Sequence, residues 1–521
     1  MGYVTVGLHF DPNDWLQPPA DTIVSRVLEQ VSNPNPEIRG RIILLHDSGG
    51  NRSETVAALP KLIDTLRAKG YDLVPVSELA GLTHDQAMPP LPPRSYAQLV
   101  SLPVFITLSW IGRILTGLFV LAICLGIVRV LFLCAAGLGN RRGEARRVSP
   151  AFPEHPPLQT VLIPAHNENK VIVGAVSHVL VSDYPNLEVI VIDDGSTDDT
   201  LELVSTYYSG DPRVRLFRIP NGGKAAALNC GLKRARGHVV VALDADTHFE
   251  KDAISKLVRW FEDPEVGAVA GNAKVGNRVN MITRWQALEY VTSQNLERRA
   301  LAALGCITVV PGAIGAWRRE ALERMGGFPL DTLAEDQDLT LTLLTAGYTV
   351  LYDSSAIGWT EAPDTVKALV KQRFRWAFGT LQCLWKHRQV TLRPRFGALG
   401  LIAVPQTWLF QFLLTIVAPL VDLALIWRLA ASSMQLLQHQ DQYDPGSLQK
   451  VVAYYLAFLV IDLGSAALAL LMERRESLVL QRFGSRQLMY WVVLKALFTA
   501  AIGPLVGWGK LERKSTITEL D

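Results

Sequence analysis

The sequence predicts an α/β domain with a doubly wound, mostly parallel sheet, inserted between apolar blocks that are long enough to cross a membrane. Two observations carry this prediction. Between residues 158 and 360, short β-rich runs alternate with helical stretches, which is the pattern of a parallel sheet covered by helices. On both sides of this region lie apolar blocks of about 20 residues or more, the length that a spanning helix needs.

The composition limits the class of protein. The 521 residues include 51 lysines and arginines against 49 aspartates and glutamates, so the chain lacks the basic excess that is typical of nucleic-acid-binding proteins. Charged residues make up 19% of the chain, below the roughly 25% of an average soluble protein. The five cysteines form no CxxC pair, which argues against a zinc site and against a disulfide framework. We therefore expect a membrane protein with no nucleic-acid partner.

Four apolar blocks stand apart from the rest of the chain. They cover residues 96–137, 397–431, 451–472 and 488–508. The first block is long enough for one tilted helix or a tight helical pair, and a single helix is expected because it contains no clear turn. The last block carries Lys495 near its centre, where a lysine costs about 3 kcal/mol in a bilayer. An interfacial helix is therefore expected there.

Basic residues in the short loops predict how these blocks are oriented. Four arginines within residues 141–147 follow the first block and place that side in the cytoplasm, whereas residues 431–449 contain no lysine or arginine and are expected outside. Four more arginines within residues 474–486 return the chain to the cytoplasm. The predicted protein is a multi-pass protein of the inner or plasma membrane, with residues 1–90 outside and residues 141–395 in the cytoplasm.

Four short runs rich in apolar and β-branched residues are expected to form the first strands of the sheet. Helical stretches are expected to follow, beginning near Asn167, Thr197, Gly223 and Lys251. In doubly wound sheets, ligands bind beyond the carboxyl ends of the strands. Because two of these runs end in paired aspartates, the binding site is expected at that edge. The runs are residues 158–165, 187–194, 214–220 and 238–246.

Asp244 and Asp246 form a DxD motif directly after the apolar run VVVAL. Two carboxylates at a strand end can both reach one hard cation, and Mg²⁺ or Mn²⁺ prefers carboxylate oxygens together with substrate phosphates. Taken alone, such a motif is more often a solvated turn. Its place between an apolar strand and a helix favours a metal site, because an acidic pair there is poorly placed without a cation.

Asp193 and Asp194 leave another apolar strand in the sequence DDGSTD. Ser196 or Thr197 is expected to cap the next helix, which does not explain two adjacent aspartates. A carboxylate at this position can accept a hydrogen bond from a uracil N3–H or from ribose hydroxyls. Lys224, in NGGKAAALN, begins a helix whose N-terminal dipole suits a phosphate; otherwise it is an ordinary surface lysine.

Glu335 and Asp336 stand at the start of the helical run DLTLTLLTAG. One interpretation is an acidic helix N-terminus, which the helix dipole favours. The other makes Asp336 a general base that takes a proton from an acceptor hydroxyl during glycosyl transfer. A diphosphate leaving group then needs no general acid, because a metal stabilises it.

The segment Gln372 to Trp376 lies in the basic amphipathic stretch VKALVKQRFRW. It is either a membrane-surface helix with snorkelling arginines or an acceptor site, and both interpretations can hold together. In the second, Trp376 offers an apolar face to a sugar ring. Arg375 neutralises a diphosphate, and Gln372 bonds to an acceptor hydroxyl.

With these motifs in order, residues 150–515 resemble the processive, membrane-embedded family 2 glycosyltransferases of the GT-A fold. This family includes cellulose, chitin, hyaluronan and poly-N-acetylglucosamine synthases. Ala334 replaces the threonine of the family's TED motif, which puts only local hydrogen bonding in doubt. Residues 267–276 and 309–320 look most like the poly-N-acetylglucosamine branch. The family's PxxNE, DDG, DxD, TED and QxxRW motifs are found here as residues 164–168, 193–195, 244–246, 334–336 and 372–376.

The resemblance implies a role for each matching residue. Asp336 would be the catalytic base, while Asp244 and Asp246 would hold Mg²⁺ or Mn²⁺. The nucleotide-sugar donor would be bound by Pro164, Asn167, Glu168, Asp193, Asp194, Lys224 and Asp244. The acceptor and the diphosphate would be held by Glu335, Gln372, Arg373, Arg375 and Trp376.

The implied reaction is polymerisation of a UDP-sugar, most closely UDP-N-acetylglucosamine, into a β-linked polysaccharide that also crosses the bilayer. The alternatives within enzymes are a short oligosaccharide or another UDP-sugar, as in chitin, hyaluronan or cellulose synthases, and transfer to a lipid-linked acceptor. A non-catalytic membrane scaffold is a different class of function. It predicts the loss of motif carboxylates, and Asp194, Asp244, Asp246 and Asp336 are all present.

Residues 1–87 resemble the C-terminal part of a polysaccharide deacetylase (NodB-like) domain. His46, in LLHD, matches the late catalytic histidine of that family, whereas the earlier metal-binding motifs are absent from this sequence. We therefore expect no deacetylase activity from this segment alone, and a partner that deacetylates or exports the polysaccharide would fit. The predicted organisation continues with a linker and transmembrane helix (88–140), the GT-A domain (141–395) and C-terminal transmembrane and interfacial helices (396–521).

Overall fold

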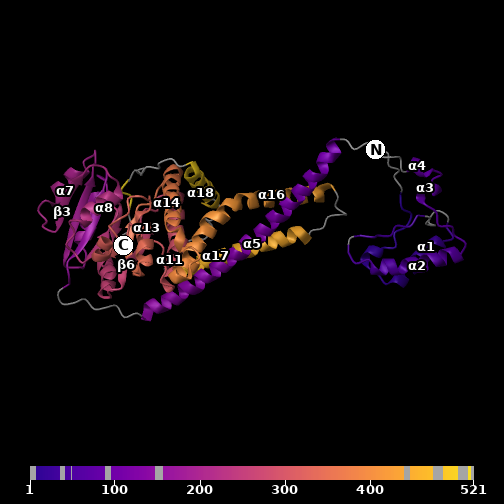
Figure 1. Cartoon of the computed structure of the whole chain (residues 1–521), viewed down its shortest axis with the longest axis horizontal. Coiled ribbons are helices and arrows are strands. Elements are labelled where there is room, and N and C mark those ends of the chain that lie inside the picture. The colour runs from indigo at the N-terminus through magenta and orange to yellow at the C-terminus, as the bar shows by residue number, and fades with distance from the viewer. Residues whose placement is uncertain are drawn as a thin grey trace. The chain divides into compact units, whose positions relative to one another are not determined.

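The computed structural model of the chain separates into two compact units, Met1–Trp110 and Ile111–Asp521 (Figure 1). The residues that it describes are 7–35, 42–48, 50–87, 96–146, 156–438, 446–472, 485–502 and 514–517.

The first unit contains a pair of packed helices, α1 (Ala20–Val31) and α2 (Ser53–Ala68). Their apolar faces bury Val27 and Leu62 in a small core. Phe10 and Ile43 form an isolated parallel bridge beside this pair. The short helices of this unit are η1 (Asp14–Leu16), α3 (Val76–Leu79) and α4 (His84–Ala87).

The second unit is built on one eight-stranded sheet with the strand order β3-β2-β1-β4-β7-β6-β8-β5. The first four of these strands pair in parallel, whereas β7 is antiparallel to both of its neighbours and β5 is antiparallel to β8. The predicted α/β fold is confirmed, with a parallel half and a mixed half. The strands are β1 (Gln159–Ala165), β2 (Leu187–Asp194), β3 (Val214–Ile219), β4 (Val239–Ala242), β5 (Thr247–Phe249), β6 (Val266–Val275), β7 (Gly315–Arg318) and β8 (Thr349–Thr360).

Strands β1, β2 and β4 are mostly apolar and buried because both faces of the sheet are covered by helices, whereas β3 at the edge of the sheet is only partly buried. Successive residues of β1 point to opposite faces, so Leu162 enters one core and Val161 and Ile163 enter the other. Every residue of β2 is buried. The helices that follow the first strands are α6 (Ile172–Leu180), α7 (Thr200–Tyr208), α8 (Lys224–Leu232) and α9 (Ala253–Val258).

Most of the remaining helices around the sheet belong to its mixed half. The π-helix η3 continues directly from α10, and α14 follows β8 after a short connection. The bounds are α10 (Met281–Glu289), η3 (Tyr290–Asn295), α11 (Leu296–Ala303), α12 (Arg319–Arg324), α13 (Glu335–Thr345) and α14 (Val366–Lys386).

The first apolar block forms one continuous helix, α5 (Tyr96–Arg146), as expected. Within the described residues, the segments long and apolar enough to cross a membrane are Trp110–Asn140 and Leu399–Leu420. The second of these runs from the π-helix η6 (Leu399–Ala403) through α15 (Val404–Gln406) and the π-helix η7 (Thr407–Leu413) into α16 (Leu414–Gln438). Beyond it lies α17 (Gly446–Met472).

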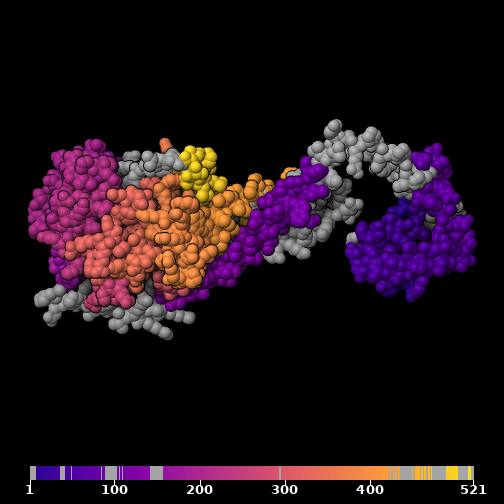
Figure 2. Space-filling model, in the orientation of Figure 1, coloured from indigo at the N-terminus to yellow at the C-terminus, as the bar shows by residue number. Residues whose placement is uncertain are grey.

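The last apolar block forms α18 (Ser485–Ile502), which packs against α14 and α16 (Figure 2, yellow against orange). Val492, Val493 and Ala496 of α18 are fully buried in the main core. The ammonium of Lys495 lies 5.1 Å from the ring centroid of Phe374, on the QxxRW helix. The orientation of these helices in a membrane, including the interfacial placement of α18, stays a prediction.

Candidate active site

The second aspartate of the DDG motif shapes the loop that leads to Lys224. The two carboxylate oxygens of Asp194 accept hydrogen bonds from the N–H groups of Gly222 (2.7 Å) and Gly223 (2.9 Å). Gly223 has φ of 85°, which glycine tolerates and other residues rarely adopt. Helix α8 begins at the next residue, so Asp194 determines where Lys224 stands. Asp193 is fully buried, with a carboxylate oxygen 3.3 Å from Nε of Arg218.

The PxxNE segment is joined to the DDG segment by side-chain hydrogen bonds. Asn167 has a left-handed backbone (φ 54°), and its Oδ1 accepts from the N–H of Thr197 at 2.7 Å. Its own N–H donates to Oγ of Ser196 at 2.9 Å. The next residue, Glu168, donates its N–H to Oγ1 of Thr200 at 2.7 Å. Pro164 lies in β1 beside the same strand ends.

The expected cap of the following helix is wrong. Helix α7 begins at Thr200 with Asp199 as its N-cap residue, and no side chain caps it. Ser196 and Thr197 instead bond to Asn167, a residue about 30 positions earlier in the chain. These hydroxyls therefore join two loops of the site rather than ending one helix.

A single ammonium group connects the DxD and AED motifs. Nζ of Lys224 lies 2.6 Å from Oδ1 of Asp244 and 3.2 Å from Oε1 of Glu335. The lysine side chain is only 11% exposed, whereas that of Asp244 is 34% exposed. Burial lowers the pKa of Lys224, but the charges of Asp244, Glu335 and Asp336 outweigh it and raise the pKa, so the group stays a cation.

Glu335 is the buried partner in this cluster. Burial raises the pKa of its carboxyl group, and the nearby charges of Asp336 and Asp244 raise it further, against the lowering effect of Lys224. Four ionisable groups thus share one small volume at the edge of the sheet. Clusters of ionisable groups with shifted pKa values are common at functional sites, because catalysis and binding often need charged groups close together.

Asp336 is oriented by backbone donors. Its Oδ2 accepts from the N–H of Gly312 at 3.0 Å, and its Oδ1 accepts from the N–H of Gln337 at 2.8 Å. A Cβ atom on Gly312 would lie 2.5 Å from Nζ of Lys224 and would push the ammonium aside. The glycine therefore lets the loop before β7 approach both the base candidate and the lysine.

The QxxRW residues stand on α14 with different exposures. Trp376 is 37% exposed, and Arg375 is partly exposed. Gln372 is buried, and its Oε1 accepts no hydrogen bond from the residues that the structure describes. Arg373 is buried in an ion pair with Glu289 (2.7 Å) and lies 4.3 Å from the ring centroid of Trp376. Arg373 therefore supports the indole, while its predicted contact with acceptor or diphosphate stays a prediction.

Tyr290 is a site residue that the sequence analysis missed. It opens the π-helix η3, is buried, and its ring centroid lies 6.4 Å from that of Trp376. Burial raises the pKa of its phenol, and the charges of Arg373 and Asp246 also act on it. Its ring therefore packs beside Trp376 of the QxxRW helix. A tyrosine at the end of an ordinary helical stretch gave no signal in the sequence.

The AED and QxxRW helices are bound tightly to each other. Oγ1 of Thr380 donates to Oε1 of Gln337 at 2.9 Å, and a Cβ atom on Gly379 would lie 2.8 Å from Cβ of Ala334. The departure from the TED motif therefore lies at a close helix–helix contact between small residues. At the other end, the buried Asp338 bonds to His387 at 2.7 Å. Asp336 and Trp376 therefore stand on two helices that are packed firmly against each other.

The residues of the DxD motif suit a divalent cation by their chemistry. Asp244 is accessible and Asp246 is nearly buried, and both follow β4 directly. The lysine ammonium already held by Asp244 and Glu335 shows that this cluster accommodates positive charge. Two carboxylates fill only part of the coordination shell of Mg²⁺ or Mn²⁺, which leaves positions for substrate phosphates.

A second cluster of possible metal ligands lies in the first unit. Among the described residues, ligand atoms of Asp11, Asp14 and His46 lie within 4.8 Å of one another. Asp14 is buried and is 2.8 Å from Nδ1 of His46. Burial raises the pKa of Asp14, but hydrogen bonds from His46 and Thr55 outweigh it and lower the pKa. The predicted likeness of this segment to a deacetylase stays a prediction.

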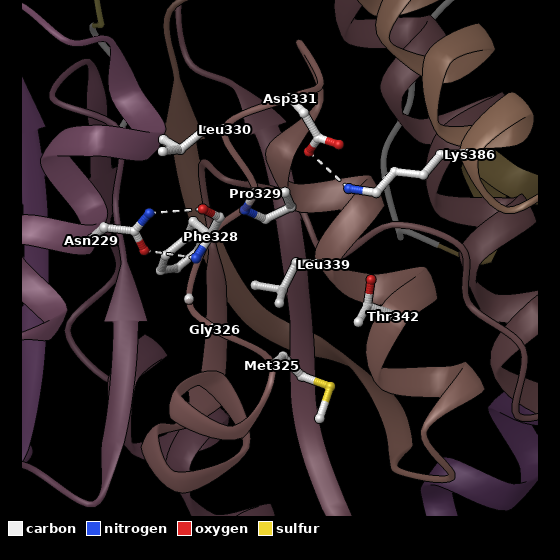
Figure 3. Close-up of a pocket in the computed structure, with 11 residues that line it drawn as sticks. Asn229, Met325, Gly326, Phe328, Pro329, Leu330, Asp331, Leu339, Thr342 and Lys386 are labelled. Carbon is white, nitrogen blue, oxygen red and sulfur yellow. Dashed lines mark hydrogen bonds and ion pairs between the residues drawn. The ribbon is translucent and has the colours of Figure 1, made fainter.

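An open hollow of about 510 Å³ is lined by residues of α8, α13 and α14 and by the segment from Met325 to Asp331 (Figure 3). None of the predicted site residues lines it. Asn229 holds both backbone groups of Phe328 on one side, and Asp331 pairs with Lys386 at 2.8 Å on the other. The polar groups of this hollow therefore bond to one another.

Comparison with known proteins relates these motifs to one family. Residues 160–326 match the model of glycosyl transferase family 2. This stretch of the chain is therefore similar to family 2 glycosyltransferase domains. The predicted enzyme class is confirmed at this level, and the matched residues include the DDG turn, Lys224 and the DxD motif.

The curated relatives of this glycosyltransferase domain include poly-β-1,6-N-acetyl-D-glucosamine synthases. The protein of Staphylococcus aureus is 31% identical over 260 residues, which cover 49% of this chain and 63% of the relative. That of Staphylococcus epidermidis is 30% identical over 254 residues, covering 48% and 62%. The matches thus span less than two thirds of the length of these relatives.

Two solved structures are similar to parts of the chain. A mannosyltransferase from Pyrobaculum calidifontis, in complex with GDP-Man and Mn²⁺, is 25% identical with a TM-score of 0.49, covering 66% of this chain and 98% of its own. The TarS 1–349 structure from S. aureus, in complex with UDP-GlcNAc, is 19% identical with a TM-score of 0.30, covering 43% and 66%.

Proposed function

We propose that this chain is a membrane-embedded, inverting glycosyltransferase that extends a β-linked polysaccharide from a UDP-activated sugar, UDP-N-acetylglucosamine. The observation that supports it best is the contact of Lys224 with both Asp244 and Glu335, because it unites the donor and base motifs around one cation. The similarity to poly-β-1,6-N-acetyl-D-glucosamine synthases supports the choice of sugar.

In this proposal Asp336 is the general base. Its two carboxylate oxygens each accept a backbone hydrogen bond, which fixes their direction before substrate arrives. The carboxylate takes the proton of an acceptor hydroxyl while the hydroxyl oxygen attacks the anomeric carbon of the donor. The bond from that carbon to the diphosphate breaks, and UDP leaves with the electron pair. Attack from the side opposite UDP inverts the configuration at that carbon.

The donor is held at the strand ends. Asp193 and Asp194 lie where a nucleoside would be bound, with Asn167 and Glu168 on the neighbouring loop. Asp244 and Asp246 would hold Mg²⁺ or Mn²⁺, which supplies charge neutralisation for the diphosphate leaving group. Lys224, a cation at the N-terminus of α8, adds positive charge on the same side.

The acceptor end of the polymer is held by α14. The partly exposed indole of Trp376 offers an apolar face to a sugar ring and is supported from behind by Arg373 and Tyr290. Gln372 brings a buried carbonyl oxygen that is available to an acceptor hydroxyl. Arg375 would neutralise the diphosphate from the same helix.

The proposed setting is the inner or plasma membrane, with the catalytic domain in the cytoplasm and the first unit outside. The apolar segments Trp110–Asn140 and Leu399–Leu420 support a membrane location. Export of the polymer, and a partner that deacetylates or exports it, belong to the same proposal. We expect a cysteine at position 516 to resist labelling in intact cells. External labelling there would instead make α18 a spanning helix.

The decisive experiment is incubation of the purified protein with radiolabelled UDP-sugars, followed by digestion with linkage-specific hydrolases. We expect a polymer only from UDP-N-acetylglucosamine, and none from the Asp336→Asn variant. Incorporation of another sugar would mean that the donor is a different UDP-sugar. Label in a lipid fraction would indicate a lipid-linked acceptor. The absence of transfer with every donor would contradict the proposal.

A further inference from the structure

A short segment near the C-terminus, residues 514–517, lies on the catalytic domain. We call this segment the C-terminal tail. It follows α18 in the chain, yet its hydrogen bonds go to residues more than 150 positions earlier. No motif and no family match covers it, because the matched region ends at residue 326.

The tail is held by one buried carboxylate. Glu361 is only 6% exposed, and it accepts hydrogen bonds from the N–H of Lys514 (3.0 Å) and the N–H of Ser515 (3.2 Å). Its Oε1 also accepts from Oγ1 of Thr516 at 2.9 Å. Ser515 has φ of 57°, which turns the backbone so that consecutive N–H groups point to the same carboxylate.

Further contacts surround this centre. The ammonium of Lys514 pairs with Asp364 at 2.6 Å, and Nδ2 of Asn277 donates to Oγ1 of Thr516 at 3.2 Å. A Cβ atom on Gly276 would lie 2.8 Å from Cγ2 of Ile517, so the tail packs closely on the end of β6. A buried carboxylate, an ion pair, an amide and an apolar contact together make this a specific docking site.

The tail docks at a connection that matters for the proposed reaction. Residues 361–365 join β8 to α14, the helix that carries Gln372 and Trp376. The last residue of β8, Thr360, pairs with Thr247, which follows Asp246 directly. Three side chains from the β6–α10 region bind the same connection. Asn277 bonds to both backbone groups of Ala362, Asn280 bonds to the carbonyl of Asp364, and Gln286 bonds to the carbonyl of Pro363.

We infer that Glu361 is a positioning residue that clamps the C-terminal tail onto the β8–α14 connection, so that the tail sets the position of the QxxRW helix. The occupant of this site is a segment of the same chain, not a ligand. Two consequences follow. The tail lies on the same side of any membrane as the catalytic domain. When the tail is released, residues 361–365 lose these contacts, and α14 with the proposed acceptor residues moves from its place. The proposed donor residues at the strand ends do not move.

The docking itself is tested without any assay of activity. The full-length variant with Asp364→Cys and Lys514→Cys is treated with a short bis-maleimide crosslinker, which adds to both thiols, and is then digested, and the linked peptides are identified by mass spectrometry. Lys514→Cys combined with Tyr207→Cys is the matched control, because Tyr207 is exposed on α7 at the other end of the sheet. Lys514→Cys alone controls for the five native cysteines. We expect a crosslink only in the first pair; its absence, or an equal yield in the control pair, overturns the inference.

The positioning role rests on the proposed function and has its own test. Glu361→Gln, Thr516→Val and deletion of residues 514–521 are compared by kcat for polymer synthesis and by KM for the donor. We expect Glu361→Gln to lower kcat roughly 10-fold or more with KM changed less than about twofold, since displacement of a positioned group lowers rate before donor binding. Glu323→Gln, on the exposed face of α12, is the matched control and should leave both unchanged.

The losses in kcat of single and combined variants distinguish a positioning role of Glu361 from a general loss of stability. If Glu361 acts through the tail, the deletion lowers kcat as much as Glu361→Gln does, and the combined variant loses no more than either alone. Thr516→Val, which removes one hydrogen bond and keeps the shape, gives a smaller loss in kcat. Additive losses, an unchanged kcat or an equal rise in KM would each overturn the positioning role. A wild-type protein without transferase activity would refute the proposed function, and the crosslink would still decide whether the tail docks.

Discussion

The two halves of the sheet hold their functional residues by different means. In the parallel half, side chains of Asn167 and Asp194 bond to backbone N–H groups of neighbouring loops, so each residue is fixed at a strand end. In the mixed half, Asp336 and Trp376 stand on α13 and α14, which a side-chain hydrogen bond joins, and the C-terminal tail binds the connection that precedes α14. The proposed donor residues at the strand ends are therefore held mainly by hydrogen bonds between neighbouring loops. The acceptor side depends on contacts between segments far apart in the chain.

This difference suits the proposed chemistry. A nucleotide donor is the same molecule in every cycle, and a fixed set of strand-end groups can bind it. An acceptor polymer advances by one sugar after each transfer, so its binding residues must allow movement. Partly exposed Trp376, supported by Arg373 and Tyr290, offers an apolar surface along which a sugar can slide. The comparison predicts that variants of the two halves fail in different ways.

The largest effect is expected on the donor side, from Asp246→Asn. This change removes one carboxylate of the DxD motif at a buried position, where a hard cation would bridge protein and diphosphate. We expect loss of metal-dependent UDP release and much weaker donor binding, with the fold intact. UDP release with Mg²⁺ or Mn²⁺, measured with and without a chelator, checks this, and calorimetry reports donor binding. Turnover that survives both the variant and the chelator would falsify the metal assignment.

The next effect is expected from Asp336→Asn, which keeps the shape of the side chain and removes the base. Transfer should fall by roughly 10²-fold or more, while donor affinity stays close to that of the wild type. Calorimetry with the UDP-sugar, beside transfer rates, separates the two quantities. Loss of donor binding in this variant would show that Asp336 is a metal or nucleotide ligand, and the base assignment would be wrong.

A smaller and more selective effect is expected from Trp376→Ala. The indole should hold the acceptor by contact with its ring, so polymer synthesis should fall about 10-fold, while slow hydrolysis of the donor by water should change little. Transfer and hydrolysis rates measured on the same preparation check this. Phe374→Ala is a useful control, because that ring lies on the same helix and faces Lys495 of α18. Unchanged polymer synthesis in Trp376→Ala would leave α14 as a membrane-surface helix only.

The same comparison explains what could be predicted from the sequence. The strands β1 to β3 were predicted to within one residue, because apolar runs in a covered sheet have few alternatives, whereas β4 ends at Ala242 rather than at the predicted Asp246. The acidic motifs stand at or just beyond the ends of β2 and β4, and their roles stay predictions. Lys224, predicted from its place at a helix start, stands beside Asp244.

What could not be predicted depends on contacts that no local pattern records. Ser196 and Thr197 carry a strong capping signal, but the side chain of Asn167 competes for them from another loop. Tyr290 and Glu361 belong to no motif, and their roles appear only when η3 and the C-terminal tail are folded against the sheet. The burial of α18 against α14 is likewise a tertiary contact.

The smallest effect on activity, but a clear one on stability, is expected from Asp338→Asn at the junction of α13 and α14. Asp338 is fully buried and bonds to His387 (2.7 Å), Lys386 (2.8 Å) and Thr332 (3.1 Å). Burial raises the pKa of its carboxyl group, but the hydrogen bonds from His387 and Lys386 outweigh it and lower the pKa below its ordinary value of 3.8. The variant should lose roughly 1.5–3 kcal/mol of the free energy of unfolding at neutral pH, because a hydrogen-bonded buried charge is removed.

The pH dependence of this loss identifies its cause. A carboxylate with a lowered pKa contributes stability that is fully present above its unfolded pKa and is lost as pH falls through the folded pKa. The difference in melting temperature between Asp338→Asn and the wild type should therefore be largest near pH 7 and shrink below about pH 4. Asp331→Asn is the matched control, because Asp331 pairs with the same Lys386 at 2.8 Å but is 64% exposed, and exposed ion pairs contribute little. A loss in Asp338→Asn that does not depend on pH would mean that packing, not the charge of Asp338, holds the two helices together.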